Sequence, residues 1–281
     1  MEDSKRPRQM DFFFDGIIAS EHISYKDDRE LMTIPTVHLG SRPRKKPIIW
    51  THPDDRRNTW VKVSASEEYS LANVHDLDIV LYVLSNLASQ VNKGIRPERT
   101  IKTTAYNLLK SINRGTGGAE YANLKNALRR LKATVVETNI RLPRLQQSSM
   151  FSWLGDWIED PESGELYLTC SEFLYRGIVD QKSMLTLNAD YFKLQSGILK
   201  FLYRIARRSV GKDNDYWEWT MDTLHDRSAS QSTLSDFKKN VRKVVAKANE
   251  DGSFPDYNLE IVGDKKQEKI IMTPKKKEVI G

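Results

Sequence analysis

The sequence of 281 residues lacks most patterns on which enzymes and membrane proteins depend. Its single cysteine, Cys170, excludes an intramolecular disulfide and any zinc site built from several cysteines. Its five histidines are scattered, with no His-x-His or His-Glu-x-x-His pair to hold a metal. No apolar run approaches the length that spans a bilayer, and the first residues lack the hydrophobic core of a secretion signal. We therefore expect a soluble, cytoplasmic protein with no metal, no cofactor and no membrane contact.

A phosphate-binding loop is also missing. The glycine-rich segment 114–118 (RGTGG) lacks the lysine of such a loop and follows a predicted helix rather than a strand, which favours a flexible turn. The adjacent carboxylates at 27–28 and 54–55 lie in turn-like sequence, and solvated turns explain them better than metal sites. With no catalytic constellation in view, we expect a protein that is not an enzyme.

Positive charge is present, and it is concentrated in two segments. The formal net charge is +6, whereas residues 119–133 and 231–249 together carry a net +7, so the rest of the chain is nearly balanced. A clustered excess of this kind favours an acidic partner such as nucleic acid.

The two basic segments repeat one pattern. Residues 124–132 (LKNALRRLK) and 237–245 (FKKNVRKVV) align without a gap, and both have apolar residues at i, i+4 and i+7. At about 100° per residue these form one stripe of a helix, while the Lys at i+1 and the Arg at i+5 lie together beside it. One such flank is typical of a solvated helix surface, but the recurrence in the same upstream context indicates two copies of a DNA-reading module.

The elements around these segments also recur. In the first half the pattern predicts a helix capped by Asp76, a helix starting near Thr104, a glycine-containing turn, the basic helix and then strands. In the second half it predicts a helix over 196–208, a strand over 216–219, a helix capped by Thr220, the basic helix over 233–248 and a hairpin of 257–262 with 269–273. This order is that of a winged helix-turn-helix. The predicted fold class is therefore α+β, with tandem winged-helix domains and a β-hairpin-rich insert.

The sequence divides into three predicted parts. Residues 1–70 form a loosely organised N-terminal extension, 71–170 the first winged-helix domain with the β insert, and 171–281 the second winged-helix domain with a basic C-terminal tail. Within the extension, residues 48–64 are predicted to form a hairpin. Prolines interrupt the basic segment 41–47, and two roles remain open for it: an arm that binds phosphates, or a linker. Apolar residues over 12–18 have no assigned partner, and they provide a surface on which the protein could dimerise.

The insert over 151–170 is rich in aromatic residues. Phe151, Trp153 and Trp157 alternate in strand fashion before a turn at 160–164. Stacking on unpaired bases is one role for them. Burial in the core of a hairpin is the favoured one, because large aromatics supply much of the apolar area that a small sheet can bury.

Four short segments carry a resemblance to a known family. These segments are 183–192 (SMLTLNADYF), 201–208 (FLYRIARR) and 230–238 (SQSTLSDFK), preceded by 173–178 (FLYRGI). In this order they resemble the bacterial plasmid replication initiators of the replication initiator protein A family, over roughly residues 70–262. The resemblance implies tandem winged-helix domains that bind repeated sequences, called iterons, in the double-stranded DNA of a plasmid origin.

The resemblance also implies partners. Initiators of this kind help to melt adjacent AT-rich DNA and recruit the host replication initiator and the replicative helicase. Related initiators repress their own promoter as dimers and act at the origin as monomers, so monomer and homodimer are both open here. A transcriptional repressor without initiation activity is the alternative function, and a relaxase or primase is a third class for which no site is visible.

If each basic helix enters a major groove, its N-terminal residues face base edges and its later Lys and Arg residues meet phosphates. Gln231 is the best candidate for base reading because Gln can contact adenine bidentately, and Asn123 has the corresponding place in the first module. The predicted DNA-binding residues are Asn123, Lys125, Arg129, Arg130, Lys132, Gln231, Ser232, Thr233, Ser235, Lys238, Lys239, Arg242, Lys243, Lys265 and Lys266.

Overall fold

The computed structural model describes residues 16–20, 23–53, 58–141, 147–180, 183–211, 214–264 and 267–276. The helices are α1 (Leu77–Asn92), α2 (Ala105–Ser111), α3 (Gly118–Ala133), α4 (Glu172–Val179), α5 (Gly197–Ser209), α6 (Met221–Ser228) and α7 (Leu234–Glu250), with a 3-10 helix at Ala189–Lys193. The strands are β1 (Ile17–Ile18), β2 (Lys26–Asp28), β3 (Ile48–Thr51), β4 (Trp60–Ala65), β5 (Thr100–Thr104), β6 (Thr134–Thr138), β7 (Ser149–Ser152), β8 (Leu154–Glu159), β9 (Glu165–Cys170), β10 (Met184–Thr186), β11 (Trp217–Thr220), β12 (Tyr257–Val262) and β13 (Lys269–Pro274).

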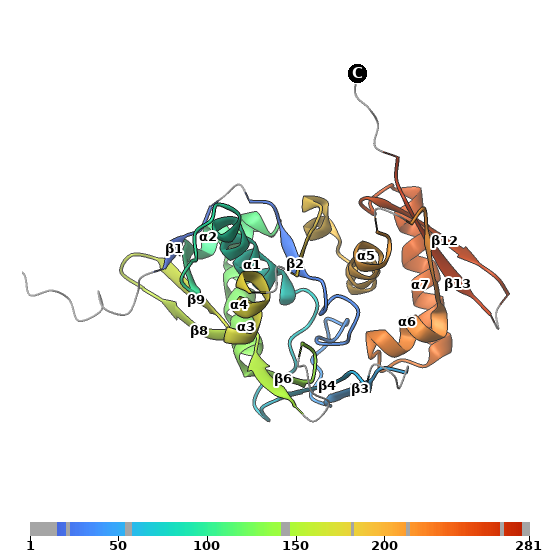
Figure 1. Cartoon of the computed structure of the whole chain (residues 1–281), viewed down its shortest axis with the longest axis horizontal. Helices are drawn as coiled ribbons and strands as arrows, with labels where there is room; N and C mark the ends of the chain where they lie inside the picture. The colour runs from blue at the N-terminus through green and yellow to red at the C-terminus, as the bar shows by residue number, and fades with distance from the viewer. Residues whose placement is uncertain are drawn as a thin grey trace, which may run out of the picture.

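The elements gather in two lobes (Figure 1). Helices α1 to α4 lie in one lobe, and α6, α7 and the β12–β13 hairpin lie in the other, with β2 and α5 between them. Strands β3, β4 and β6 run along one side below both lobes. Within the described residues, each helix is too short or too polar to cross a membrane.

Threonine side chains begin three of the helices. The hydroxyl oxygens of Thr104, Thr220 and Thr233 each accept a hydrogen bond of 3.1 Å from the backbone N–H three residues later. Such N-caps satisfy donors that have no partner within the helix. Asp76 precedes α1 as predicted, but its side chain does not cap that helix and instead accepts a hydrogen bond from the backbone N–H of Asn73 at 3.0 Å.

Two units of the chain share one order of elements. In the first, β5 leads into α2 and α3, and β5 pairs antiparallel with β9 of the β8–β9 hairpin. In the second, β11 leads into α6 and α7, and β11 pairs antiparallel with β13 of the β12–β13 hairpin. A strand, two helices and a hairpin in this order form a winged helix-turn-helix. The predicted α+β class with tandem winged helices is confirmed.

The hairpin of β8 and β9 has a different place from the one predicted. We expected residues 151–170 to form an insert between the modules, but pairing of β9 with β5 makes β8–β9 the wing of the first unit. The inserted strands are β6 and β7, which join β3 and β4 in a sheet of order β3-β4-β6-β7. The hairpin predicted over 48–64 is confirmed by the antiparallel pairing of β3 with β4.

Residues 26–53 and 58–65 are more ordered than the loose extension we predicted. Strand β2 pairs with β10, and β4 pairs with β6. In the segment 41–47, Arg44 is buried and donates a hydrogen bond of 2.6 Å to the carbonyl oxygen of Ala229, just after α6. This arginine therefore holds the segment against the second unit. The division of the chain into three domains at 70 and 170 stays a prediction.

The aromatic residues that begin the hairpin region are buried, as the sequence favours. Trp153 is 1% exposed, and Phe151 stacks on Phe173 with ring centroids 4.2 Å apart and planes 5° from parallel. Trp157 packs partly buried against the same core. These rings stabilise the first lobe by burying apolar area, so Phe151 and Trp153 present no free faces to bases.

Two buried ion pairs fix α5 against the first lobe. Lys200 Nζ lies 2.9 Å from Asp78 Oδ1 on α1, and Arg204 Nε lies 2.6 Å from Asp27 Oδ2 on β2. All four side chains are at most 4% exposed. Burial lowers the pKa of Lys200, while Asp78 opposes that shift. Because a buried charge without its partner costs about 3–5 kcal/mol, these pairs favour one orientation of α5.

Candidate nucleic-acid interface

Helix α3 buries its apolar stripe and exposes polar residues along its outer side. Leu124, Leu128 and Leu131 are at most 2% exposed, as the spacing predicts. Asn123 is exposed near the start of the helix, and Arg129 is exposed one and a half turns later. Arg129 donates a hydrogen bond of 3.1 Å to Asn126 Oδ1 on its own helix, and within the described residues no carboxylate forms an ion pair with it. Arg129 can therefore turn toward a phosphate without giving up an ion pair.

Two other basic residues of α3 are paired with acidic residues of the wing. Lys125 Nζ lies 2.8 Å from Glu159 Oε2, and Lys132 Nζ lies 2.9 Å from Asp156 Oδ1. Both carboxylates come from β8, which packs beside α3. These ion pairs are substantially exposed, so they add little stability, but they cancel two positive charges of the predicted DNA-binding face.

Arg130 binds inside the protein. Its guanidinium makes two hydrogen bonds to the Asp76 carboxylate, Nε to Oδ2 at 2.8 Å and the second terminal nitrogen to Oδ1 at 2.7 Å. Asp76 is 3% exposed and Arg130 25%. The hydrogen bonds to Asp76 raise the pKa of Arg130 above its ordinary value. This bidentate pair joins α3 to the start of α1, and it explains why the Asp76 side chain does not cap α1.

The segment leading into α7 is a network of short hydrogen bonds. The hydroxyls of Ser230 and Ser232 lie 2.9 Å apart, and the carbonyl oxygen of Ser232 lies 2.9 Å from His225 Nε2 on α6. Thr233 caps the helix. Gln231 is exposed in the middle of this network, and its side chain makes no hydrogen bond with another described residue. The turn thus holds Gln231 in place while leaving its amide available.

The basic residues of α7 differ from one another in surroundings. Lys238 is buried, with Nζ 3.3 Å from Asp222 Oδ2 on α6. Lys239 and Lys243 are exposed, and their side chains form no ion pair or hydrogen bond with the part of the chain that the structure describes. Ser235 is exposed one turn before Lys239. Because Ser235, Lys239 and Lys243 are spaced at i, i+4 and i+8, they lie on one side of the helix.

Arg242 connects α7 to the wing of the second unit. Its Nε lies 2.6 Å from Glu268 Oε1, and a terminal nitrogen lies 3.0 Å from Oε2. Glu268 is buried, whereas the Arg242 side chain is 43% exposed, so one edge of the guanidinium remains open to solvent. The hydrogen bonds to Glu268 raise the pKa of Arg242. Lys265 and Lys266, predicted in the same wing, lie outside the described residues.

The acidic partners of these basic residues were not predicted from the sequence. They are Asp76, Asp156, Glu159, Asp222 and Glu268. Each lies at least 16 residues from its partner in the chain, so no local spacing indicates the pair.

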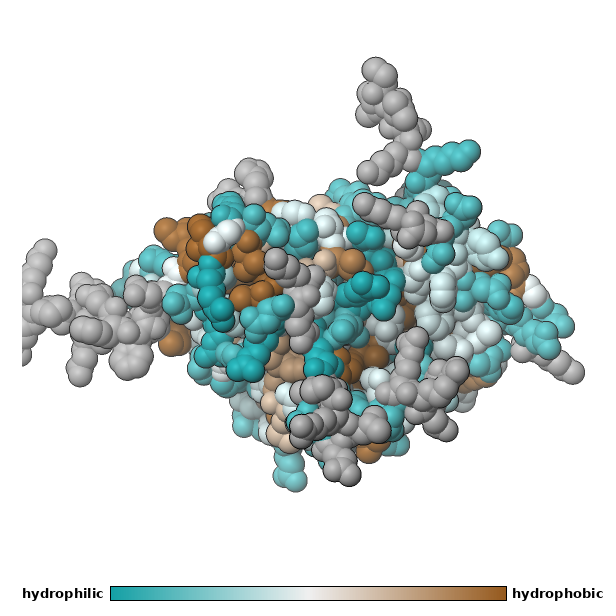
Figure 2. All heavy atoms as spheres, in the orientation of Figure 1, coloured by the Kyte–Doolittle hydropathy of each residue, from teal (hydrophilic) through white to brown (hydrophobic). Residues whose placement is uncertain are grey.

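In the view of Figure 2, hydrophobic residues gather over the lobe of α1–α4, whereas hydrophilic and intermediate residues cover most of the lobe of α6 and α7.

The sequence is similar to known replication proteins. Residues 26–259 match the family described as replication initiator protein A. A protein of Wigglesworthia glossinidia brevipalpis named "Putative replication protein" is 31% identical over 210 residues, which cover 72% of this chain and 74% of that protein.

Two solved structures share the fold. A structure of domains 2 and 3 of RctB matches with a TM-score of 0.63 and 12% identity, covering 91% of this chain and 99% of that one. A second crystal structure of RctB domains 2–3 matches with a TM-score of 0.55 and 12% identity, covering 85% and 95%. At this identity the likeness is one of fold alone.

Proposed function

Because this chain belongs to the replication initiator protein A family, we propose that it starts plasmid replication by binding repeated duplex sequences at the origin. The family assignment confirms the resemblance drawn from the sequence. In this proposal the bound protein promotes opening of adjacent AT-rich DNA and recruits the host replication initiator and the replicative helicase. It also represses its own promoter when the same sequence occurs there.

The observation that supports this proposal most directly is the repeated unit. Both units have a strand, two helices and a hairpin, and in both the second helix of the helix-turn-helix carries exposed basic side chains. In proteins of this type that helix lies in the major groove with its N-terminal residues toward the bases. Two such helices on one chain fit a site of two successive major grooves.

Base reading falls to the polar residues at the start of each helix. Gln231 and Asn123 can each contact adenine through both ends of the side-chain amide. Ser232 and Ser235 lie near Gln231 in the sequence, and their hydroxyl groups can add contacts to bases or phosphates. Since Thr233 already caps α7, its contribution is to fix the turn that presents Gln231.

Phosphate binding falls to the basic residues that the protein leaves accessible. Lys239, Lys243 and Arg129 are exposed, and none of them pairs with a carboxylate of the described residues. The exposed edge of the Arg242 guanidinium adds to them. Lys125 and Lys132 can contact phosphate after exchanging their carboxylates on β8 for it. Arg130 and Lys238 stabilise the helices that carry the others, because their charges are matched within the protein.

We further propose that the chain acts without catalysis of its own. The sequence has no phosphate-binding loop, and within the described residues no three His, Cys, Asp or Glu side chains are grouped so as to hold a metal. The work of strand opening then comes from binding energy and from the host proteins. Nicking of supercoiled DNA by the purified protein would contradict this and would indicate a relaxase instead.

The test is replication of a plasmid that carries only the candidate origin. In cells that supply this protein in trans, we expect the plasmid to be maintained, and in cells without it we expect loss. A Gln231→Ala variant supplied at the same level is a matched control for DNA recognition. Repression of a promoter reporter without any plasmid maintenance would refute initiation and leave a transcriptional repressor.

A further inference from the structure

Residues 41–47 (SRPRKKP) form a basic loop between β2 and β3. The structure describes the chain around this loop without a gap, from residue 23 to residue 53. Its basic residues are Arg42, Arg44, Lys45 and Lys46. The sequence leaves two roles open for the loop, an arm that binds phosphates and a linker. The contacts of the basic side chains favour the arm.

The backbone of the basic loop is held on the side of the first lobe. The backbone N–H of Leu71, just before α1, donates to the carbonyl oxygen of Arg44 at 2.7 Å. Leu39 packs so closely on the start of α5 that a Cβ at Gly197 would lie 2.1 Å from the Leu39 carbonyl oxygen. Two prolines within the loop each fix a backbone dihedral. The loop is therefore ordered before any partner binds, which lowers the cost of forming a site.

The side chain of Arg44 holds the basic loop against the second unit. Its guanidinium donates to the carbonyl oxygen of Ala229 at 2.6 Å, and within the loop to those of Lys46 at 2.9 Å and Pro47 at 3.2 Å. Ala229 follows α6 and lies two residues before Gln231. Because Arg44 is only 9% exposed, it is a positioning residue, which sets the loop beside the turn that leads into α7.

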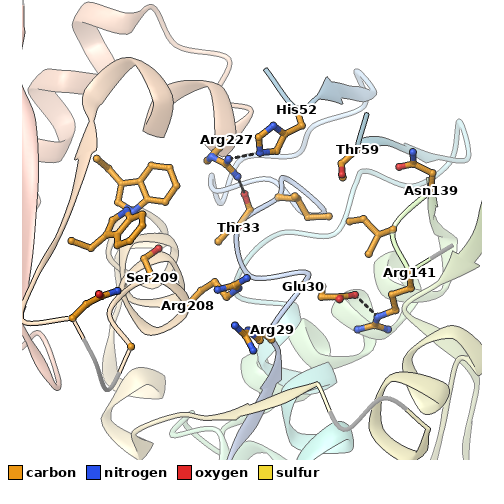
Figure 3. A pocket seen from close by; sticks show the side chains of 16 residues that line it. Arg29, Glu30, Thr33, His52, Thr59, Asn139, Arg141, Arg208, Ser209 and Arg227 are labelled. Atoms are coloured by element: carbon orange, nitrogen blue, oxygen red, sulfur yellow. Dashed lines mark hydrogen bonds and ion pairs between the residues drawn. The ribbon is translucent and has the colours of Figure 1, made fainter. Parts of the chain in front are cut away.

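The last turn of α6 makes further contacts with the chain on both sides of the basic loop. Arg227 donates to the carbonyl oxygen of Thr33 at 2.8 Å and lies 3.0 Å from His52 Nε2, as Figure 3 shows. Trp50 Nε1 on β3 donates to Asp226 Oδ2 at 2.6 Å. Together these contacts keep the loop and the helix-turn-helix of the second unit in one relative position.

The opposite side of the basic loop adjoins α3 of the first unit. Lys45 Nζ donates to the carbonyl oxygen of Glu67 at 2.8 Å. Two residues later, the pKa of Tyr69 is raised, mainly by a hydrogen bond with Glu68, and the positive charge of Arg129 on α3 opposes this shift. Tyr69 is therefore close enough to Arg129 for its charge to act. The basic loop thus lies between the exposed side of α3 and the turn that leads into α7.

Three basic side chains of the loop keep their charge accessible. Arg42 and Lys46 are exposed, and neither pairs with a carboxylate of the described residues. Lys45 is exposed too, and it binds a carbonyl oxygen, which leaves its charge unmatched. Together with Arg129 they set four positive charges against the two glutamates of the adjoining segment 66–70. A surface of this kind, with net positive charge, favours an anionic partner.

Duplex DNA fits this position. Two recognition helices in successive major grooves on one face of a duplex leave the minor groove between them facing the protein. The negative potential of a minor groove attracts Arg and Lys side chains. A basic loop that lies between the two recognition helices is therefore next to the phosphates along that groove.

We propose that the basic loop is a third DNA contact, in which Arg42 and Lys46 bind phosphates along the minor groove between the two half-sites. This inference rests on the proposed function, because it needs both units on one duplex. A linker would explain the connection between β2 and β3. It would not explain why a buried arginine fixes the loop or why two unpaired cations remain on its surface.

The experiment titrates the full chain with a duplex that carries one repeat of the candidate origin, at several salt concentrations. The double variant Arg42→Gln with Lys46→Gln changes two exposed positions and should keep the thermal melting of the protein. We expect its affinity at about 0.1 M salt to fall at least about tenfold, and the slope of log K against log salt to decrease by about two. The double variant Lys93→Gln with Arg96→Gln, exposed just after α1, removes the same two charges and should change neither quantity.

Duplexes with neutral methylphosphonate linkages locate the contact. Neutral linkages midway between the half-sites should weaken binding of the unmodified protein, but they should not weaken the Arg42 and Lys46 double variant further, because its contacts there are already lost. Neutral linkages at the outer ends of the site should weaken both proteins equally. Equal weakening of both proteins by the central linkages would overturn the proposal.

The loop contact and the proposed function fail in different ways. If the unmodified protein shows no preference for the origin repeat over random duplex, origin binding is refuted and the loop contact with it. If the protein binds the repeat and maintains the plasmid, while the Arg42 and Lys46 double variant keeps the salt slope of the unmodified protein, only the loop contact is refuted.

Discussion

At the scale of single residues, similar positions in the two basic helices have different surroundings. Lys125 and Lys238 share one place in the repeated pattern, yet the first is exposed beside a wing carboxylate and the second is buried. Arg129 and Arg242 share another place, and only Arg242 is held by a carboxylate. Sequence periodicity predicts which side of a helix a residue occupies, whereas its charge partners come from distant parts of the chain.

The first prediction concerns Lys243. Its ammonium is exposed and pairs with no carboxylate of the described residues, so a contact with DNA releases one condensed counterion. Lys243→Gln should weaken binding to specific and random duplexes alike and reduce the slope of log K against log salt by about one. Titrations at several salt concentrations measure this slope. Lys93→Gln, at an exposed position just after α1, should leave it unchanged; equal slopes for both variants would remove Lys243 from the interface.

The second prediction concerns Gln231. Its amide is exposed within an ordered turn, which suits it for reading a base rather than for holding the fold. Gln231→Ala should reduce the preference for the cognate sequence by about 1–3 kcal/mol at one base pair and leave binding to random DNA nearly unchanged. Competition between cognate and random duplexes provides the measurement. Equal losses on both would show that Gln231 contacts the backbone instead.

The third prediction concerns the dependence of stability on pH. The pKa of His38 is lowered from 6.5 to about 4, mainly by burial and next by the positive charge of Arg44 nearby. Above pH 6.5 the imidazole is neutral in both states, so it does not affect stability. As the pH falls below 6.5 the unfolded chain binds the proton first, and the folded state should lose up to about 3 kcal/mol by pH 4.

Denaturant unfolding of the protein and of His38→Asn across this pH range measures that loss. The variant has no titrating group here, so its stability should fall less steeply between pH 6.5 and pH 4. Parallel curves would show that His38 keeps an ordinary pKa in the folded protein.

At the scale of elements, the sequence predicted the helices and hairpins better than their pairing. Capping by Thr104 and Thr220 and the apolar spacing of α3 and α7 are local signals, and the structure confirms the helices they indicate. The wing of the first unit was misplaced because β-strand pairing depends on residues far apart in the chain. Strand β6 follows α3 directly, but it pairs with β4 and β7, and the wing comes later in β8–β9.

The same long-range pairing places carboxylates of β8 against α3, which gives a fourth prediction. Glu159→Gln removes the charge that pairs with Lys125, and because this pair is exposed, stability should change by less than about 1 kcal/mol. The released ammonium should strengthen DNA binding several-fold at low salt and raise the salt slope by up to about one. Glu98→Gln, at an exposed site after α1, is the matched control. Unchanged affinity for Glu159→Gln would show that this side of α3 does not approach DNA.

At the scale of the whole molecule, the junction between the units was not predictable. Asp27 and Asp78 resemble ordinary surface carboxylates in the sequence, and Asp27 with Asp28 was interpreted as a solvated turn. The structure buries both and pairs them with Arg204 and Lys200 of α5. A hydropathy pattern does not indicate that these charged residues are buried, because the partner of each lies more than 100 residues away in the chain. They fix α5 against the first lobe, and α5 contacts α7 of the second unit, which favours one relative orientation of the two units.

A fixed orientation of the units predicts a fixed spacing in the DNA. Two recognition helices on one face of a duplex lie about one helical turn apart, near 34 Å, which corresponds to a protected site of roughly 20 base pairs. Inserting five base pairs between the two halves of the site turns one half by about 180° to the opposite face. Because the buried pairs Lys200–Asp78 and Arg204–Asp27 resist such a rotation, affinity should fall at least about tenfold. Footprinting and titration on both duplexes measure the effect, with replacement of the central five base pairs as the control; undiminished affinity for the spaced site would mean that only one unit grips the DNA.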